Sequence, residues 1–141
     1  MTSRSGAAAI LAVLAGTAPA FAMTDYKWKY RPLLVFADSE ASGPLAEQRR
    51  IVAASRASLT ERNVVVIWVV GDTVSAELGP QPREGAKTLR ARFGAAKGGF
   101  RVVLVGKDGG TKLNSASPLG AGALYATIDA MPIRQNEMRR N

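Results

Sequence analysis

The 141-residue chain contains no cysteine and no histidine. Without cysteine there can be no disulfide, thiol nucleophile or dithiol exchange, so thiol redox activity is excluded. Without histidine as well, zinc sites of the Cys/His type and Ser-His-Asp triads are impossible. We therefore expect no catalytic residue, no cofactor and no metal site. An enzyme of an unrecognised, non-thiol type stays open as an alternative.

The chain also lacks an apolar run long enough to be a membrane span. Residues 7–16 form a ten-residue apolar core after Arg4, and an A-x-A sequence at 20–22 follows. This pattern predicts a signal peptide over residues 1–22, cleaved after Ala22. A membrane anchor would need about 20 apolar residues. We expect a periplasmic or secreted protein with no transmembrane segment after cleavage.

Acidic residues are few, with 11 Asp and Glu against 19 Lys and Arg. Cleavage would remove only Arg4 from this balance, which leaves 18 − 11 = +7. Such a charge favours anionic partners, such as lipid, envelope polysaccharide or an acidic protein. Alternatively, the scattered basic residues only keep the protein soluble. We expect an unknown protein or an anionic envelope component as partner, and no nucleic acid.

Residues 23–141 have the length of a single domain, with a core over about 28–133 and a charged C-terminal tail. Apolar, β-branched stretches predict strands at 33–37, 63–70, 100–105 and 111–114. Helical periodicity predicts helices at 45–62, at 83–93, and from Pro118, capped by Ser117, to 131. Residues 71–82 read as an irregular connection.

The resulting order is β-α-β-α-β-β-α. A crossover makes the first two strands parallel and a hairpin adds antiparallel strands, which gives a four-stranded mixed sheet with helices on both faces. We therefore expect an α/β, thioredoxin-like three-layer sandwich. A small Rossmann-like domain is the alternative, although no G-x-G-x-x-G follows any strand.

Three segments carry a family resemblance: RPLLVFA at 31–37, VLVGKDGGTKL at 103–113 and IDAMPIR at 128–134. They resemble an uncharacterised family of small secreted bacterial proteins. The same domain is similar to one in animal extracellular proteins with sushi repeats or coiled coils, a group called P-DUDES. The resemblance covers residues 28–137. It implies a thioredoxin- or peroxiredoxin-like fold and an extracytoplasmic location, and it brings no assigned activity.

In thioredoxin-like enzymes, the reactive thiols follow the first strand and a cis-proline precedes the third. In this chain the segment after the first strand, residues 38–45, has Ser39 and Ser42 and no cysteine. Gly-Gly-Phe at residues 98–100 stands where the cis-proline would be. A serine nucleophile would need Lys107, Glu40 or Asp38 as its base. Loop or capping roles are more typical of such serines.

Lys107-Asp108-Gly109-Gly110 is predicted to be a hairpin turn with Asp-Gly at its centre, since Walker A spacing is absent. Asp129 is expected to contact Arg134 or Lys112 and so lock the last helix to the hairpin. Alternatively, Lys107, Lys112 and Arg134 form an anion-binding face. Gln48, on the apolar face of its helix, either bonds the end of the first strand or is half exposed.

The candidate binding or structural residues are Asp38, Gln48, Lys107, Asp108, Gly109, Lys112, Asp129 and Arg134. The sequence favours a non-catalytic module that binds a protein or an envelope component. The alternatives are an enzyme that uses Asp38, Ser39 and Lys107, and a binder of anionic lipid or polysaccharide.

Overall fold

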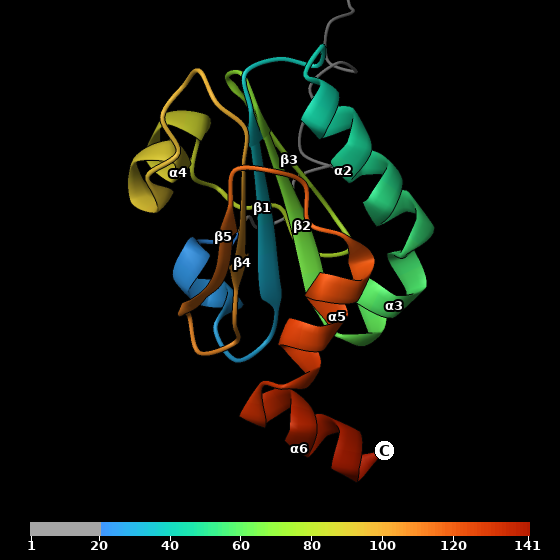
Figure 1. The fold of residues 1–141 in the computed structure, drawn as a ribbon. Coiled ribbons are helices and arrows are strands. Elements are labelled where there is room, and N and C mark those ends of the chain that lie inside the picture. Colours follow the sequence, from blue (N-terminus) through green and yellow to red (C-terminus); the bar gives the residue numbers. More distant parts are fainter. Residues whose placement is uncertain (1–20) are drawn as a thin grey trace, which may run out of the picture.

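Five strands form one open mixed sheet in the order β3-β2-β1-β4-β5 (Figure 1). They are β1 (Arg31–Ala37), β2 (Val64–Val70), β3 (Thr73–Glu77), β4 (Arg101–Val105) and β5 (Thr111–Ser115). β1 and β2 run parallel, and the other neighbours are antiparallel. Every residue of β1 and β2 is buried, because helices cover both faces of these central strands. That double burial explains their continuous apolar sequences.

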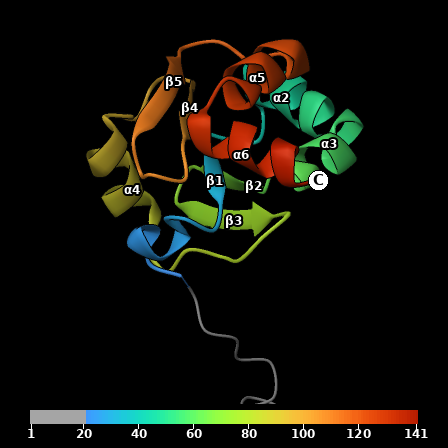
Figure 2. The ribbon, with the colours of Figure 1, turned by 90° about the horizontal axis from the view of Figure 1, so that it is seen from below.

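The computed structural model describes residues 21–141, so the predicted signal peptide lies outside the described residues except for Phe21 and Ala22. Its helices are η1 (Met23–Tyr26), α2 (Gly43–Ala54), α3 (Arg56–Glu61), α4 (Ala86–Phe93), α5 (Ala121–Asp129) and α6 (Pro132–Arg140). Seen from below, α2, α3 and α5 cover one face of the sheet, η1 and α4 cover the other, and α6 lies across the end (Figure 2). Within residues 21–141, no helix is long and apolar enough to cross a bilayer.

The two faces of β1 belong to two separate cores. Leu33 and Val35 pack with side chains of α2, α3 and α5, whereas Leu34 and Phe36 pack with those of η1 and α4. The alternation follows from the two-residue repeat of a strand. Together the cores fix both helical layers on the sheet, which is therefore the rigid frame on which any site is built.

The prediction of four strands was wrong, because the connection at 71–82 contains β3. This strand lies at the edge of the sheet, and its TVSAE sequence is half exposed. An edge strand buries little on either face and so carries only a weak apolar signal. Arg56 of α3 pairs with Glu77 of this strand, which ties the edge to the helical layer.

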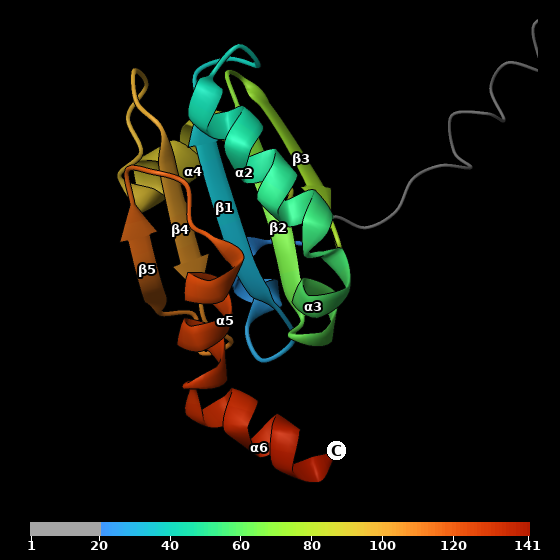
Figure 3. The same ribbon diagram turned by 45° about the vertical axis from the view of Figure 1, so that its right-hand side comes forward.

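The helix boundaries differ from those predicted in two places. The helix predicted at 45–62 is two helices, α2 and α3, which meet at Ser55 and lie along one face of the sheet (Figure 3). Ser117 does not cap the next helix, which begins at Ala121 after Gly120. The Ser117 hydroxyl instead lies 3.3 Å from Ser115 Oγ in a local turn, a use of serine hydroxyls that competes with capping.

The segment expected to be a charged tail is helix α6. Pro132 stands at its first position, where a fixed φ and a missing N–H are tolerated. Arg134 within it is 3% exposed. The C-terminal segment is therefore part of the folded domain.

The hairpin turn between β4 and β5 is longer than predicted. Gly109 N–H bonds the Gly106 carbonyl, so Lys107 and Asp108 are the central residues of the turn. Gly109 has φ +87°, and a Cβ there would lie 3.3 Å from the Lys27 side chain. Glycine is needed after the turn rather than at its centre, as in three-residue hairpin loops.

Candidate binding site

Arg31, the first residue of β1, is fully buried at the end of the sheet next to α6. Its Nη1 donates to the Arg62 carbonyl at 2.7 Å and to Glu137 Oε1 at 3.3 Å, and its Nη2 donates to Glu137 Oε2 at 3.2 Å. A buried charge is tolerated only when it is paired and hydrogen-bonded. The contact between β1 and α6 thus depends on one carboxylate.

Lys107 joins the same carboxylate from the hairpin turn. Its Nζ lies 2.7 Å from Glu137 Oε2 and 2.9 Å from Asn63 Oδ1, and the residue is 9% exposed. Burial alone would raise the pKa of Glu137, but hydrogen bonds from Lys107 and Arg31 outweigh it and lower that pKa. Glu137 is therefore an anion held between Arg31 and Lys107 at the base of the sheet, with Arg134 Nη1 3.8 Å away.

Asp129 forms a second ionic cluster beside the first. It accepts from Arg62 Nη2 at 2.9 Å and from Arg134 Nε at 3.1 Å, while Arg134 also reaches Glu61 at 2.9 Å. The pKa of Asp129 is lowered, chiefly by the hydrogen bond from Arg62. The expected contact between Asp129 and Arg134 is present, and it fixes α6 against α5 and α3 rather than against the hairpin.

Lys112 does not take part in that cluster. Its Nζ pairs with Asp108 Oδ2 at 2.9 Å across the hairpin turn. Two hydrogen bonds lower the pKa of Asp108, one from the backbone N–H of Gly110 and one from the side chain of Lys112. Lys112 keeps about a third of its side chain exposed while it lines the cavity described next.

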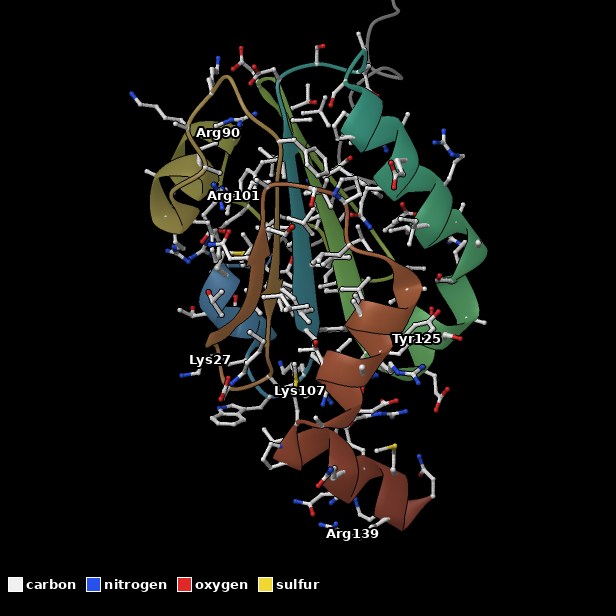
Figure 4. The ribbon with its side chains drawn as sticks, viewed as in Figure 1. Lys27, Arg90, Arg101, Lys107, Tyr125 and Arg139 are labelled. Atoms are coloured by element: carbon white, nitrogen blue, oxygen red, sulfur yellow. The ribbon has the colours of Figure 1, made fainter. Side chains whose placement is uncertain are left out.

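A cavity of about 260 Å³ opens above these clusters, and we call it the Trp28 cavity. It is lined by Trp28, Arg31, Gly106, Lys107, Asp108, Lys112, Met131, Pro132 and Ile133. Two of the three segments that carry the family resemblance, the hairpin turn and the start of α6, supply most of this lining. Lys27 and Lys107 lie at the same end of the sheet, above α6 (Figure 4).

Trp28 at the rim of this cavity is both exposed and strained. Its side chain is 64% exposed, and its backbone is left-handed with φ +69°. The Lys107 carbonyl accepts its N–H at 2.7 Å and so holds the backbone in place. Asn63 and Leu78 also have positive φ, but Asn adopts it readily and Leu78 packs on the core. Trp28 gains little burial for its strain, which points to a functional role.

The opposite end of the sheet, where β1 ends, carries the loop of residues 38–45 that was compared above with the thiol site of thioredoxin-like enzymes. A shallow cavity of about 350 Å³ there includes Asp38, Ser39, Ser42 and Gly98. Asp38 Oδ1 accepts from the Gly98 N–H at 2.7 Å, and Ser42 Oγ caps α2 by accepting from the N–H of Leu45. These polar groups are thus already used in holding the loop.

The hypothesis of an enzyme that uses Asp38, Ser39 and Lys107 together is wrong. Asp38 follows the last residue of β1, whereas Lys107 bonds Trp28 before its first residue. Seven strand residues separate the two ends by roughly 20 Å. No side chain from one end can act as a base for the other.

Gln48 is fully buried, so neither expectation for it is met. Its Nε2 donates to the Leu119 carbonyl at 3.0 Å, and its Oε1 accepts the Leu119 N–H at 2.8 Å. The paired amide contact satisfies both backbone groups of one residue in the loop before α5. Gln48 therefore anchors that loop on α2 and does not touch the end of β1.

Another cavity, of about 570 Å³, lies beside α4. Three of its four charged lining residues are engaged: Lys97 Nζ lies 3.1 Å from Asp72, and Arg90 donates to the carbonyls of Ala37 and Gly71. Lys87 is the fourth. Most of the remaining lining is alanine and glycine. Among the described residues, its lining includes no aromatic ring of the kind that Trp28 gives the Trp28 cavity.

Three residues of the site were not singled out from the sequence, namely Trp28, Arg31 and Glu137. Tyr26 in the same segment packs against the sheet at 1% exposure, whereas Trp28 is 64% exposed. The alternation of aromatic and basic residues in YKWKYR was the available signal. Glu137 had no local signal, since its partner Arg31 is 106 residues away.

The fold and these contacts define a mixed α/β domain with a cationic, aromatic-rimmed cavity at one end of its sheet. The chain belongs to the family described as domain of unknown function (DUF4174), whose profile matches residues 22–137. A zebrafish (Danio rerio) protein called coiled-coil domain-containing protein 80 is 27% identical over 133 residues. That match covers 82% of this chain and only 15% of the relative's length. No solved structure matches the chain.

Proposed function

We propose that the protein is an exported, non-catalytic, thioredoxin-like domain that binds a component of the cell envelope in the Trp28 cavity. The exposed, left-handed Trp28 is the observation that carries the proposal. A bulky aromatic residue held in an unfavourable backbone conformation without burial does not stabilise the fold. Its placement beside buried cations supports ligand recognition as its role.

The strand order supports a thioredoxin-like fold. Without the edge strand β3, the sheet reads β2-β1-β4-β5, with the first two strands parallel and the last two antiparallel. The two helices between β1 and β2, α2 and α3, share a face with α5, and α4 lies on the other face. The expected β-α-β-α-β-β-α plan is thus contained within the observed one. A relation to the P-DUDES group is part of the same proposal, and the zebrafish match supports it.

The contacts of Met23 support cleavage after Ala22. The Met23 N–H donates to Glu84 Oε2 at 3.0 Å, and Glu84 Oε1 has no hydrogen-bond partner within residues 21–141. Cleavage would turn that N–H into an ammonium group, for which the Glu84 carboxylate is a suitable partner. Protein recovered from the periplasm or medium is expected to have the intact mass of residues 23–141. A full-length chain retained in the cytosol would contradict export.

Replacing Trp28 with Asn is expected to abolish binding without loss of stability. Asn tolerates a left-handed backbone, so the free energy of unfolding should stay unchanged or rise by about 1 kcal/mol. Cosedimentation of the purified domain with isolated envelopes measures binding, and urea unfolding measures stability. We expect at least a tenfold loss of bound protein.

Leu78→Asn is the matched control, because Leu78 has the same backbone conformation but packs on the core. That variant should lose stability and, while folded, keep its binding. If Trp28→Asn bound the envelope as well as the native chain does, the Trp28 cavity would not be the binding site.

A further inference from the structure

The floor of the Trp28 cavity is built to receive an anion. The first turn of α6 contains no acidic residue, and no side chain within residues 21–141 caps it. Met131, Pro132 and Ile133 at this helix start line the cavity. A helix N-terminus presents unpaired N–H groups and a partial positive charge. Here it faces the same space as Lys107, Lys112 and the carboxylate Asp108, which pairs with Lys112 at 2.9 Å. The cations lining the cavity, with Arg31, outnumber this one anion.

Arg31 gives an independent indication at the same place. It lines the cavity and is fully buried, yet its Nε has no hydrogen-bond partner among the described residues. Its two terminal nitrogens are already used by Glu137 and the Arg62 carbonyl. A buried guanidinium N–H without an acceptor is unfavourable by about 1–3 kcal/mol. An anionic ligand or a water bound to it would remove that cost.

Trp28 at the rim of the cavity indicates how large the apolar part of the ligand is. Trp28 offers a flat, exposed ring beside the cations, with Lys27 Nζ 5.6 Å from the centre of the ring. The other large apolar side chain exposed in the described part of the chain is Met138 on α6. Two separate side chains do not make the broad apolar patch that insertion into a membrane requires. The ligand therefore needs a small apolar face next to its negative charge.

We propose, on the basis of the proposed binding function, that the Trp28 cavity binds a uronic acid residue of an acidic polysaccharide. The C–H face of the sugar ring packs on Trp28, and its carboxylate lies between the start of α6, Lys112 and Lys107. A cavity of about 260 Å³ holds one such ring. The positive charge of residues 23–141, 18 − 11 = +7, favours association with a polymer that carries a charge on each ring.

The test is a fluorescence titration of the cleaved chain, residues 23–141, with hexagalacturonate, and with maltohexaose as its neutral match. The chain has two tryptophans, and Trp68 is 3% exposed, so a saturable change on binding would come chiefly from Trp28. We expect binding of hexagalacturonate alone, weakened at least tenfold by Lys112→Met. Raising the salt concentration should weaken it further. The Trp28→Asn variant lacks the reporting ring, so its binding is measured by isothermal titration calorimetry beside the native chain, and we expect no binding heat from it.

Lys97→Met is the matched control, because Lys97 is an exposed lysine whose Asp72 pair lies beside α4, away from the Trp28 cavity. Equal weakening by Lys97→Met and Lys112→Met, or equal binding of maltohexaose, would overturn the uronate assignment. Anionic vesicles or an acidic peptide that bind through Trp28 while hexagalacturonate does not would also overturn it.

The failure of this inference can be told apart from failure of the binding function. Envelope binding that depends on Trp28 but is not displaced by hexagalacturonate would reject the uronate and leave the Trp28 cavity as the binding site. Envelope binding that is indifferent to Trp28 would reject both.

Discussion

Replacing Glu137 with Gln is expected to destabilise the domain by about 3 kcal/mol. Glu137 is the shared carboxylate of Arg31 and Lys107, which are 0% and 9% exposed. Neutralising it leaves the buried cations Arg31 and Lys107 with no anion between them, beside a third buried cation, Arg134. Urea unfolding followed by far-UV circular dichroism measures the change.

Glu40→Gln is the control for this substitution. Glu40 pairs with Arg49 on the surface, where both side chains are well exposed, and surface pairs contribute little. We expect no measurable change. A Glu137→Gln variant as stable as Glu40→Gln would mean that water reaches the cluster and that α6 is not held by it.

The same carboxylate predicts how stability depends on pH. The pKa of Glu137 is lower in the folded chain than in the unfolded one, where it is about 4.3. Its contribution is therefore complete above that value and is lost as the pH falls through the lower, folded pKa. Between about pH 5 and pH 2, the native chain should lose more stability than Glu137→Gln does. Parallel losses in the two proteins would contradict the ion-pair assignment.

Replacing Arg90 with Met is expected to destabilise the domain by about 2–4 kcal/mol. Arg90 is 6% exposed and donates to the carbonyls of Ala37 at 2.9 Å, Gly71 at 3.1 Å and Ala95 at 3.5 Å. It thus joins the ends of β1 and β2 to the loop after α4. Methionine fills a similar volume and leaves these buried acceptors short of donors.

Arg90→Lys separates the geometry of the guanidinium from its charge. A single ammonium group is a poor match for carbonyls arranged around a planar fork. We therefore expect the stability of Arg90→Lys to lie between that of the native chain and that of Arg90→Met. Since Arg90 lies at the other end of the sheet from Lys107 (Figure 4), the affinity of the folded variants for a ligand in the Trp28 cavity should not change. A change in that affinity would contradict this separation of the two ends.

The residues of the family segments have two different roles, in the fold and in the Trp28 cavity. Asp129 and Arg134 of the IDAMPIR segment form ion pairs beneath α5 and α6, so they serve the structure. Lys107 serves both, because its ammonium group is paired with Glu137 while it lines the Trp28 cavity. Lys112 is the motif residue that is best placed for a ligand.

The sequence alone determined the exclusions and the centre of the fold. The absence of cysteine and histidine removes whole classes of chemistry whatever the fold is. β1, β2 and β4 were predictable because strands buried on both faces must be apolar at nearly every position. Asp-Gly-Gly after β4 likewise required a turn with positive φ.

Only the tertiary structure decided the rest, because those features depend on partners that are distant in the chain. β3 forms because β2 offers a free edge, and α6 is held by a carboxylate that meets Arg31 from 106 residues away. The exposure of Trp28 follows from a left-handed backbone held by the Lys107 carbonyl. Local propensity carries no information on such contacts, since their free energy appears only when the separate segments are packed together.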